Sequence, residues 1–239
     1  MKLFRVTLTG ADDSIRPEQI LSLSAKYPWV EWGILFSQHS MGKPRFPSKE
    51  WIGDLELFCK NKKVHLSAHI CGRWVRDICK GEWTILTTLP VIATDLFKRI
   101  QLNFHCYQHK IKDRDAFFQP FQAPMLSSKQ LIFQVDGVND TLLEIAQAND
   151  INAAPLFDRS GGAGVLPTTW PNAGKYSVSG YAGGLSPENV EEQIKNIQIC
   201  SDGLVWIDAE TRVRSEDNQL FDLDKVEQFL KNAAPYVEV

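Results

Sequence analysis

Short apolar runs alternate with helix-like patterns along the whole chain. Continuous apolar runs of this length, rich in Val, Ile, Leu and Phe, are typical of strands buried on both faces of a parallel sheet. The pattern predicts eight such strands, at residues 3–9, 30–36, 64–70, 100–104, 131–135, 153–157, 176–181 and 204–207.

Helical patterns fill most of the segments between these strands. The first helix is predicted to begin near Pro17, where the missing N–H of proline costs nothing, and the second after Ser48, a good N-cap residue. The segment 73–98 contains Gly81 and Pro90, which predicts two helical pieces rather than one. The later helices are predicted at 141–148, from the cap at Ser186 to Ile199, and at 223–232.

Two segments lack a regular pattern. Residues 107–128 are polar and contain Pro120 and Pro124, which predicts a short helix and a loop. A Gly-rich segment follows the sixth strand, and little helix is expected before Gly174. A protein-interaction role for the irregular segment 105–128 is one interpretation, and it rests on this irregularity alone.

Eight strand-then-helix units without a long linker indicate one fold class. Parallel strands need crossover connections, and helices supply them. Eight units in 239 residues favour a single (β/α)8 TIM barrel, an α/β fold, as one domain covering residues 1–239. An open doubly wound sheet is the alternative. In a barrel the active site lies at the C-terminal ends of the strands.

Composition narrows the class of partner and compartment. Net charge is −3 and no Lys/Arg-rich run occurs, so a nucleic-acid partner is not expected. The N-terminal apolar stretch is interrupted by Arg5 and Thr7, unlike a signal peptide, and no apolar run reaches the roughly 18 residues of a membrane span. Five cysteines without framework spacing predict reduced thiols in a cytoplasmic protein.

A glycine pair after the seventh strand is the first candidate site. Gly183 and Gly184 precede the predicted helix cap at Ser186. Glycines let a ligand approach the backbone, and a helix N-terminus offers free N–H groups to an anion. The loops after strands 7 and 8 commonly hold phosphate in such barrels. An ordinary tight turn with an N-cap is the alternative interpretation.

A carboxylate after the sixth strand is the second candidate. Asp158 ends that strand and precedes a loop containing Gly161 and Gly162. A carboxylate at the mouth of a barrel can act as a general acid or base. Alternatively, Asp158 pairs with Arg159 or caps the loop.

These two segments, in this order, resemble phosphoribosylanthranilate isomerase of tryptophan biosynthesis. That family has an LLD…GGxG segment after strand 6 and an AGGLxPxNV segment at strand 7, similar to 156–164 and 182–190 here. Weaker similarities occur in residues 36–48, 100–103 and 221–226, so the resemblance spans nearly the whole chain.

The resemblance implies an Amadori rearrangement of an aminoaldose phosphate into an aminoketose, without a cofactor. It places the general acid at Asp158. The family's general base is a cysteine at the end of strand 1, where this chain has Thr9. A threonine hydroxyl is a far weaker base than a thiolate, so the rate should fall by orders of magnitude unless another group substitutes. His69 is the best replacement, unless it is a hydrogen-bonded structural histidine.

Strand 8 carries a second departure from the family. Where the family has a DxSSGVE-like phosphate segment, this chain has residues 208–214, in which Arg212 replaces the glycine. Arg212 and Arg214 could grip phosphate beside Thr211, or Glu210 could neutralise them in a surface cluster.

Arg45 and Asn103 complete the expected ligand site. Arg45 matches the family's SPRY-like segment and is expected to position an anionic substrate, whereas Asn103 stands where the family has histidine. No metal is expected, because the spacing of the histidines and cysteines near strands 3 and 4 fits no common metal motif. Those residues are His69, Cys71, His105, Cys106 and His109.

Two functional hypotheses follow. The first is an isomerase of the ketol or Amadori type, or a related lyase, acting on a small phosphorylated sugar-type molecule. The second is a repurposed, non-catalytic barrel that keeps a ligand pocket. Thr9 and Arg212 favour the second; Asp158, Arg45 and the glycine pair favour the first. The substrate, the general base and the oligomeric state stay open.

Overall fold

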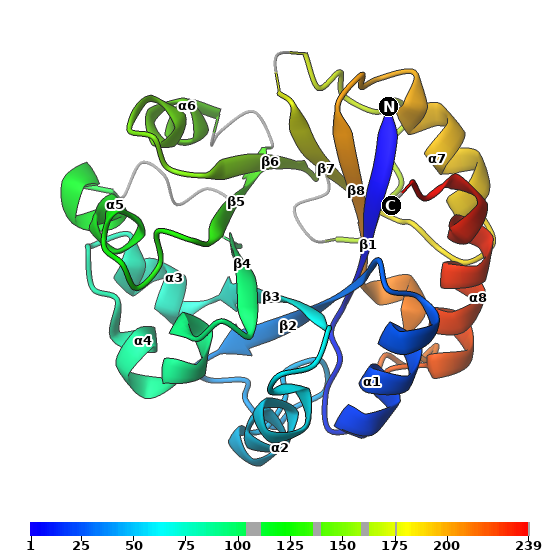
Figure 1. Cartoon of the computed structure of the whole chain (residues 1–239), viewed down its shortest axis with the longest axis horizontal. Helices are drawn as coiled ribbons and strands as arrows, with labels where there is room; N and C mark the ends of the chain where they lie inside the picture. Colours follow the sequence, from blue (N-terminus) through cyan, green and yellow to red (C-terminus); the bar gives the residue numbers. More distant parts are fainter. Residues whose placement is uncertain (104–110, 136–139, 159–162, 175, 239) are drawn as a thin grey trace.

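A computed structural model describes residues 1–103, 111–135, 140–158, 163–174 and 176–238. Eight parallel strands in these ranges form a closed barrel in sequence order, and β1 pairs with β8 to complete it (Figure 1). The predicted fold class is confirmed, and the open doubly wound sheet is wrong. The strands are β1 (Lys2–Thr9), β2 (Val30–Ser37), β3 (His65–Cys71), β4 (Phe97–Leu102), β5 (Gln130–Val135), β6 (Ala153–Phe157), β7 (Val178–Ala182) and β8 (Leu204–Ala209).

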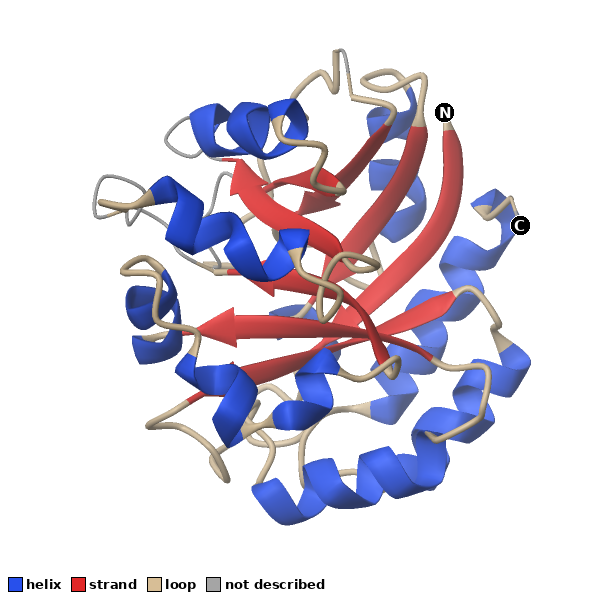
Figure 2. Cartoon of the chain, turned by 60° about the vertical axis from the view of Figure 1, so that its left-hand side comes forward, coloured by secondary structure: helices blue, strands red, loops and turns tan. Residues whose placement is uncertain are grey.

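Helices surround the barrel on its outer side (Figures 1 and 2). The Ser48 hydroxyl accepts a hydrogen bond from the Trp51 N–H, which confirms the predicted cap of the second helix. The segment 73–98 contains two short α-helices and a 3-10 turn, as its Gly and Pro residues predict. The helices are α1 (Pro17–Lys26), α2 (Lys49–Cys59), α3 (Arg73–Ile78), α4 (Thr84–Thr88), α5 (Arg114–Gln122), α6 (Asp140–Ala148), α7 (Val190–Gln198) and α8 (Leu223–Ala233), with 3-10 turns η1 (Pro90–Ala93), η3 (Thr211–Val213) and η4 (Ala234–Tyr236).

Apolar side chains form two separate cores. The larger core joins the outward-facing strand residues to the helices, and β2 contributes Val30, Trp32, Ile34 and Phe36 to it. The smaller core lies inside the barrel and contains Ile132, Ala154, Leu156 and Trp206. Gly180 makes room for this tryptophan, since a Cβ at Gly180 would lie 2.2 Å from the indole ring.

The barrel interior also holds a buried ion pair, which the sequence did not indicate. Glu31 Oε1 accepts hydrogen bonds from Arg99 Nη1 at 2.7 Å and from the Thr7 hydroxyl at 2.8 Å. Arg5 Nη1 lies 3.6 Å from the other Glu31 oxygen. The Arg99 guanidinium stacks 4.0 Å from the centre of the Trp206 ring. The pairing of the carboxylate and the stacking of the guanidinium on an aromatic ring offset the desolvation cost of burying these charges.

Two predicted element boundaries near the rim were wrong. The helix expected from Ser186 begins only at Val190, because the Asn189 side chain accepts from the Ser186 N–H and donates to the Gly184 carbonyl, which stabilises a turn instead. Strand β8 continues two residues beyond the predicted 204–207, because its pairing with β1 extends to Ala209. Asp208 therefore belongs to the strand, and its side chain is buried.

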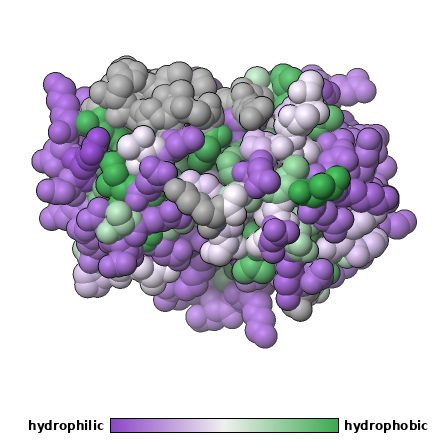
Figure 3. Space-filling view, turned by 90° about the horizontal axis from the view of Figure 1, so that it is seen from above, coloured by the Kyte–Doolittle hydropathy of each residue, from purple (hydrophilic) through white to green (hydrophobic). Residues whose placement is uncertain are grey.

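The surface is mostly polar on the face shown in Figure 3, where hydrophobic residues appear as small groups between hydrophilic ones. Across the described ranges, no helix is both long and apolar enough to cross a membrane. Cys59, Cys71, Cys79 and Cys200 have free thiols in the structure, while Cys106 lies outside the described residues.

Candidate active site

A cavity opens at the C-terminal ends of the strands, where the barrel fold places active sites. The space between atoms there is about 540 Å³, which includes open solvent, and about 60 Å³ of it can hold the centre of a water molecule. Strands β3 to β8 and the loops that follow them supply its described walls. The lining residues are His69, Gln101, Asn103, Gln134, Leu156, Asp158, Gly164, Ala182, Gly183, Gly184, Leu185, Asp208, Ala209, Glu210, Thr211 and Arg212.

Asp158 lies beside the glycine pair in the wall of this cavity. Its carboxylate is buried and accepts a hydrogen bond of 3.2 Å from Gln134 Nε2. A Cβ built on Gly183 would lie 3.8 Å from Asp158 Oδ1. The two segments are brought together because the ends of parallel strands β6 and β7 meet at the same edge of the barrel. Arg159, Gly161 and Gly162 lie outside the described residues.

Both glycines of the pair are required by the backbone. Gly183 and Gly184 have positive φ angles of 121° and 64°. A Cβ on Gly184 would lie 2.4 Å from the Leu166 N, and one on Gly183 would lie 2.9 Å from the Val165 carbonyl oxygen. The close approach that the glycines permit is thus made partly by the chain itself, through the loop after β6.

The same rim carries N–H groups suited to an anion. In the described part of the chain, the N–H groups of Gly184 and Leu185 donate no hydrogen bond, whereas the Ser186 N–H is taken by Asn189. The exposed Arg212 guanidinium likewise has no hydrogen bond or ion pair with a described residue. Free N–H groups beside a free guanidinium are the usual means by which proteins bind phosphate.

Thr9 lies one step behind the cavity wall and is bonded to Asp208. Its hydroxyl donates to Asp208 Oδ1 at 2.7 Å, and both residues are buried. Burial raises the pKa of Asp208 to about 8, even though this hydrogen bond acts in the opposite direction. Asp208 consequently holds a proton near neutral pH and can donate it. Thr9 positions this carboxyl group, and it has no contact with the cavity of its own.

His69 is a buried, neutral histidine in the cavity wall. Burial lowers its pKa to about 3, so its imidazole is a weaker base than an ordinary histidine. Its Nε2 has no hydrogen-bond partner among the described residues. Gly33 leaves room for both neighbours, since a Cβ there would lie 2.2 Å from Thr9 Oγ1 and 3.0 Å from His69 Nε2. Thr9 and His69 therefore reach the same space from β1 and β3.

Of the three arginines expected at the ligand site, two are held in ion pairs outside the cavity. Arg45 donates to Glu210 at 2.8 Å and lies outside the cavity lining. Arg214 is buried and donates to Asp12 at 2.8 Å and to the Gly10 carbonyl at 2.5 Å. Only Arg212, of these three, lines the cavity. Glu210 thus neutralises Arg45, rather than either arginine that follows it.

Asn103 lies in the wall beside a thiol that cannot act as a base. Asn103 Nδ2 lies 3.2 Å from Cys71 Sγ, and burial raises the pKa of that thiol to about 12. Gln101 Nε2 donates to Asn103 Oδ1 at 2.8 Å. No group of three or more His, Cys, Asp or Glu residues in the described chain could hold a metal ion. His105, Cys106 and His109 lie outside the described residues.

The structure brings together most of the candidate residues that it describes. Seven line one cavity, Thr9 reaches it through Asp208, and Arg45 is held at its edge. Asp208, Gln101 and Gln134 were not among the candidates. Asp208 and Gln101 carried a signal, because they lie in the segments 208–214 and 100–103 that were compared with the family. The seven are His69, Asn103, Asp158, Gly183, Gly184, Thr211 and Arg212.

Comparisons with known proteins identify the architecture. No protein-family model matches the chain, and no curated protein matches it. A solved phosphoribosyl anthranilate isomerase, in complex with reduced 1-(o-carboxyphenylamino)-1-deoxyribulose 5-phosphate, is similar with a TM-score of 0.53 and 18% identity. The match covers 98% of this chain and 100% of that chain. The shared feature is the fold.

A second solved structure is N-(5'-phosphoribosyl)anthranilate isomerase from Pyrococcus furiosus. Its TM-score is 0.49 and its identity 17%, over 97% of this chain and 99% of that chain.

Proposed function

We propose that the cavity binds a small phosphorylated sugar-type molecule and isomerises it between aldose and ketose forms, as in a ketol or Amadori rearrangement. The observation that carries the proposal is the placement of two opposed sets of groups in one cavity. Free N–H groups and Arg212 lie on the rim after β7 and β8, and the carboxyl groups of Asp158 and Asp208 line the same space.

The rim after β7 and β8 would hold the phosphate. Gly184 and Leu185 offer unpartnered N–H groups, Arg212 offers charge, and the Thr211 hydroxyl lies beside them in the wall. The phosphoribosyl anthranilate isomerase of similar fold was solved with a ribulose phosphate derivative, which supports a phosphorylated ligand here.

The two carboxyl groups would move the protons. Opening a sugar ring needs a proton on the ring oxygen, and isomerisation needs a proton taken from C2 and one returned to C1. Asp208, with a pKa of about 8, is the group that can donate near neutral pH. Asp158, which accepts from Gln134, would take the proton from C2 and return it to C1, while Asp208 would regain its proton from the hydroxyl or amine on C1. In this proposal Asp158 is the general base and Asp208 the general acid, whereas the family resemblance implies that Asp158 is the acid.

A non-catalytic barrel is the second candidate, and one observation favours it. The strand 1 residue is Thr9, and its hydroxyl is already donated to Asp208, so it offers no base to a ligand. His69 does not replace it readily, because burial lowers its pKa to about 3. Under this alternative the cavity would bind the phosphorylated molecule without changing it.

Phosphate binding and turnover can be tested separately. Inorganic phosphate should raise the melting temperature, and Arg212→Ala should weaken its binding at least tenfold. Lys62→Ala is the matched control, because it removes an exposed positive charge before β3, at the opposite end of the barrel. If Arg212→Ala and Lys62→Ala bind phosphate equally well, the proposed phosphate site is wrong.

Turnover is followed by NMR in D2O. The substrates are aldose phosphates, ketose phosphates and a phosphoribosyl arylamine, the type of compound on which the isomerase of similar fold acts. Conversion of the aldose into the ketose, with deuterium entering at C1 of the ketose, should occur with the wild type and disappear with Asp158→Asn, while phosphate binding remains. Phosphate binding with neither conversion of aldose into ketose nor deuterium exchange at any pH from about 6 to 9 would establish the non-catalytic alternative.

A further inference from the structure

The inner wall of the cavity is built from amide side chains. Gln101 and Gln134 come from neighbouring strands β4 and β5, and Asn103 follows β4. Their amide nitrogens are engaged within the wall, with Gln101 donating to Asn103 and Gln134 to Asp158. This arrangement fixes the orientation of the Gln101 amide and leaves its Oε1 as an acceptor for a ligand.

Two polar atoms of this wall have no partner within the described protein. They are Gln101 Oε1 and His69 Nε2, on side chains that are 3% and 1% exposed. Leaving buried polar atoms unpaired is unfavourable, and such atoms usually receive a hydrogen bond from a water molecule or a ligand. Both side chains line the cavity, and a ligand hydroxyl that packs against this wall would supply the hydrogen bond that the two closed-off atoms lack.

The apolar part of the described wall is small and entirely aliphatic. It consists of Leu156, Ala182, Leu185 and Ala209, and no described aromatic side chain lines the cavity. Sites for aromatic rings generally present aromatic or extended apolar surface to the ring faces. The wall is therefore better matched to hydroxyl groups than to an aryl group.

The charges of the wall argue against a second acid group on the ligand. Arg212 is the one cation among the described lining residues, and the phosphate would take it. Arg45 lies outside the lining and is paired with Glu210. An additional carboxylate would lie near Asp158 with no second cation among the described lining residues, and like charges at short range are unfavourable.

We propose that the ligand is a hydroxyl-rich sugar phosphate without an aromatic acid group, held by Gln101 and His69 at its hydroxyls and by the β7–β8 rim at its phosphate. This inference rests on the proposed function and narrows its substrate class. It separates this chain from the isomerase of similar fold, which was solved with a carboxyphenylamino ribulose phosphate.

Isothermal titration with three probes tests the inference on the unmodified protein. The probes are inorganic phosphate, ribulose 5-phosphate and reduced 1-(o-carboxyphenylamino)-1-deoxyribulose 5-phosphate. Ribulose 5-phosphate should bind at least tenfold more tightly than either of the other two. Tighter binding of the arylamine compound overturns the inference. Equal binding of inorganic phosphate and ribulose 5-phosphate also overturns it, although the phosphate site then stands. Binding of none of the three overturns the proposed function as well.

A substitution locates the hydroxyl contacts. Gln101→Met should weaken ribulose 5-phosphate about three- to tenfold, the range of one neutral hydrogen bond, and leave inorganic phosphate unchanged. Ser67→Ala is the matched control, because Ser67 is also buried inside the barrel with an unpartnered hydroxyl but does not line the cavity. Equal affinities of Gln101→Met and Ser67→Ala for ribulose 5-phosphate would refute the assigned contact.

Discussion

Replacing Asp208 by asparagine should stabilise the fold while removing the proposed acid. Asp208 is buried, and burial raises its pKa to about 8. Asparagine has nearly the same shape, and its carbonyl oxygen can still accept the hydrogen bond from Thr9. The substitution therefore removes an ionisable group without creating a cavity.

The size of the effect follows from proton binding. Near pH 7 the unfolded carboxyl, with a pKa of 3.8, is ionised, whereas the folded one, with a pKa of about 8, binds a proton. Taking up that proton costs about 1.4 kcal/mol for each pH unit above 3.8, or about 4 kcal/mol at pH 7. Imperfect hydrogen bonding of the new amide offsets about 1 kcal/mol or more. We expect Asp208→Asn to raise the free energy of unfolding by about 2 to 3 kcal/mol at pH 7.

The pH dependence has a definite sign. The folded pKa is raised, so the stability that Asp208 contributes is complete below pH 3.8 and is lost as the pH rises towards 8. The free energy of unfolding of the variant, relative to the wild type, should therefore rise by about 1.4 kcal/mol per pH unit between pH 3.8 and about 8. Above pH 8 this difference should stay constant. His69 titrates in both proteins, so its contribution cancels in the comparison.

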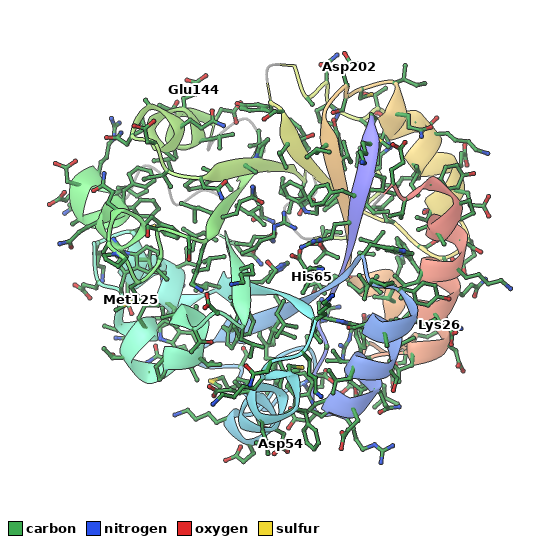
Figure 4. All side chains as sticks on the ribbon, viewed as in Figure 1. Lys26, Asp54, His65, Met125, Glu144 and Asp202 are labelled. Carbon is green, nitrogen blue, oxygen red and sulfur yellow. The ribbon has the colours of Figure 1, made fainter. Side chains whose placement is uncertain are left out.

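Urea unfolding of both proteins at pH 5, 6, 7 and 8 measures this difference. Asp202→Asn is the control, because it removes the same charge from an exposed side chain at the outer edge of the structure (Figure 4). Its stability relative to the wild type should hardly change with pH. A difference for Asp208→Asn that stays constant with pH, or a variant less stable than the wild type at pH 8, would refute the reasoning.

Four further outcomes are expected. Isomerase activity should decline as the pH rises through about 8, since the proposed acid Asp208 then loses its proton; a rate that keeps rising above pH 9 would exclude it as the acid. Gly184→Ala should lower the free energy of unfolding by about 1 to 3 kcal/mol in urea titrations and weaken phosphate binding, because a Cβ would meet the Leu166 backbone at positive φ. Glu31→Gln should cost about 3 to 5 kcal/mol in the same assay, since it leaves the Arg99 charge buried and unpaired; a loss below 1 kcal/mol would contradict this. His69 should show no imidazole protonation by NMR between pH 5 and 8, because its pKa is about 3.

The sequence predicted the barrel and the meeting of the two main candidate segments. Apolar runs of strand length, each followed by a helical pattern, define both the order and the direction of the strands. Parallel order then places every strand end on one rim, which is why Asp158 and Gly183 could be predicted to face the same cavity. That inference needs no side-chain detail.

The sequence did not predict the pairing of charges at the rim. Arg45 and Glu210 are far apart in the chain, as are Asp12 and Arg214, and each pair forms only where β1 and β8 close the barrel. The late start of α7 was missed for a local reason, since the Asn189 side chain competes for backbone groups that a helix would use.

The pairing of the first strand with the last has a consequence for synthesis. The hydrogen bond from Thr9 to Asp208 joins residues 199 positions apart, and Arg214 donates to Gly10 and Asp12 across the same seam. A nascent chain emerges from the ribosome at about 5 to 20 residues per second, with its N-terminus first. Thr9 must therefore wait until β8 has been synthesised before its partner exists, and the cavity can assemble only after that strand has emerged.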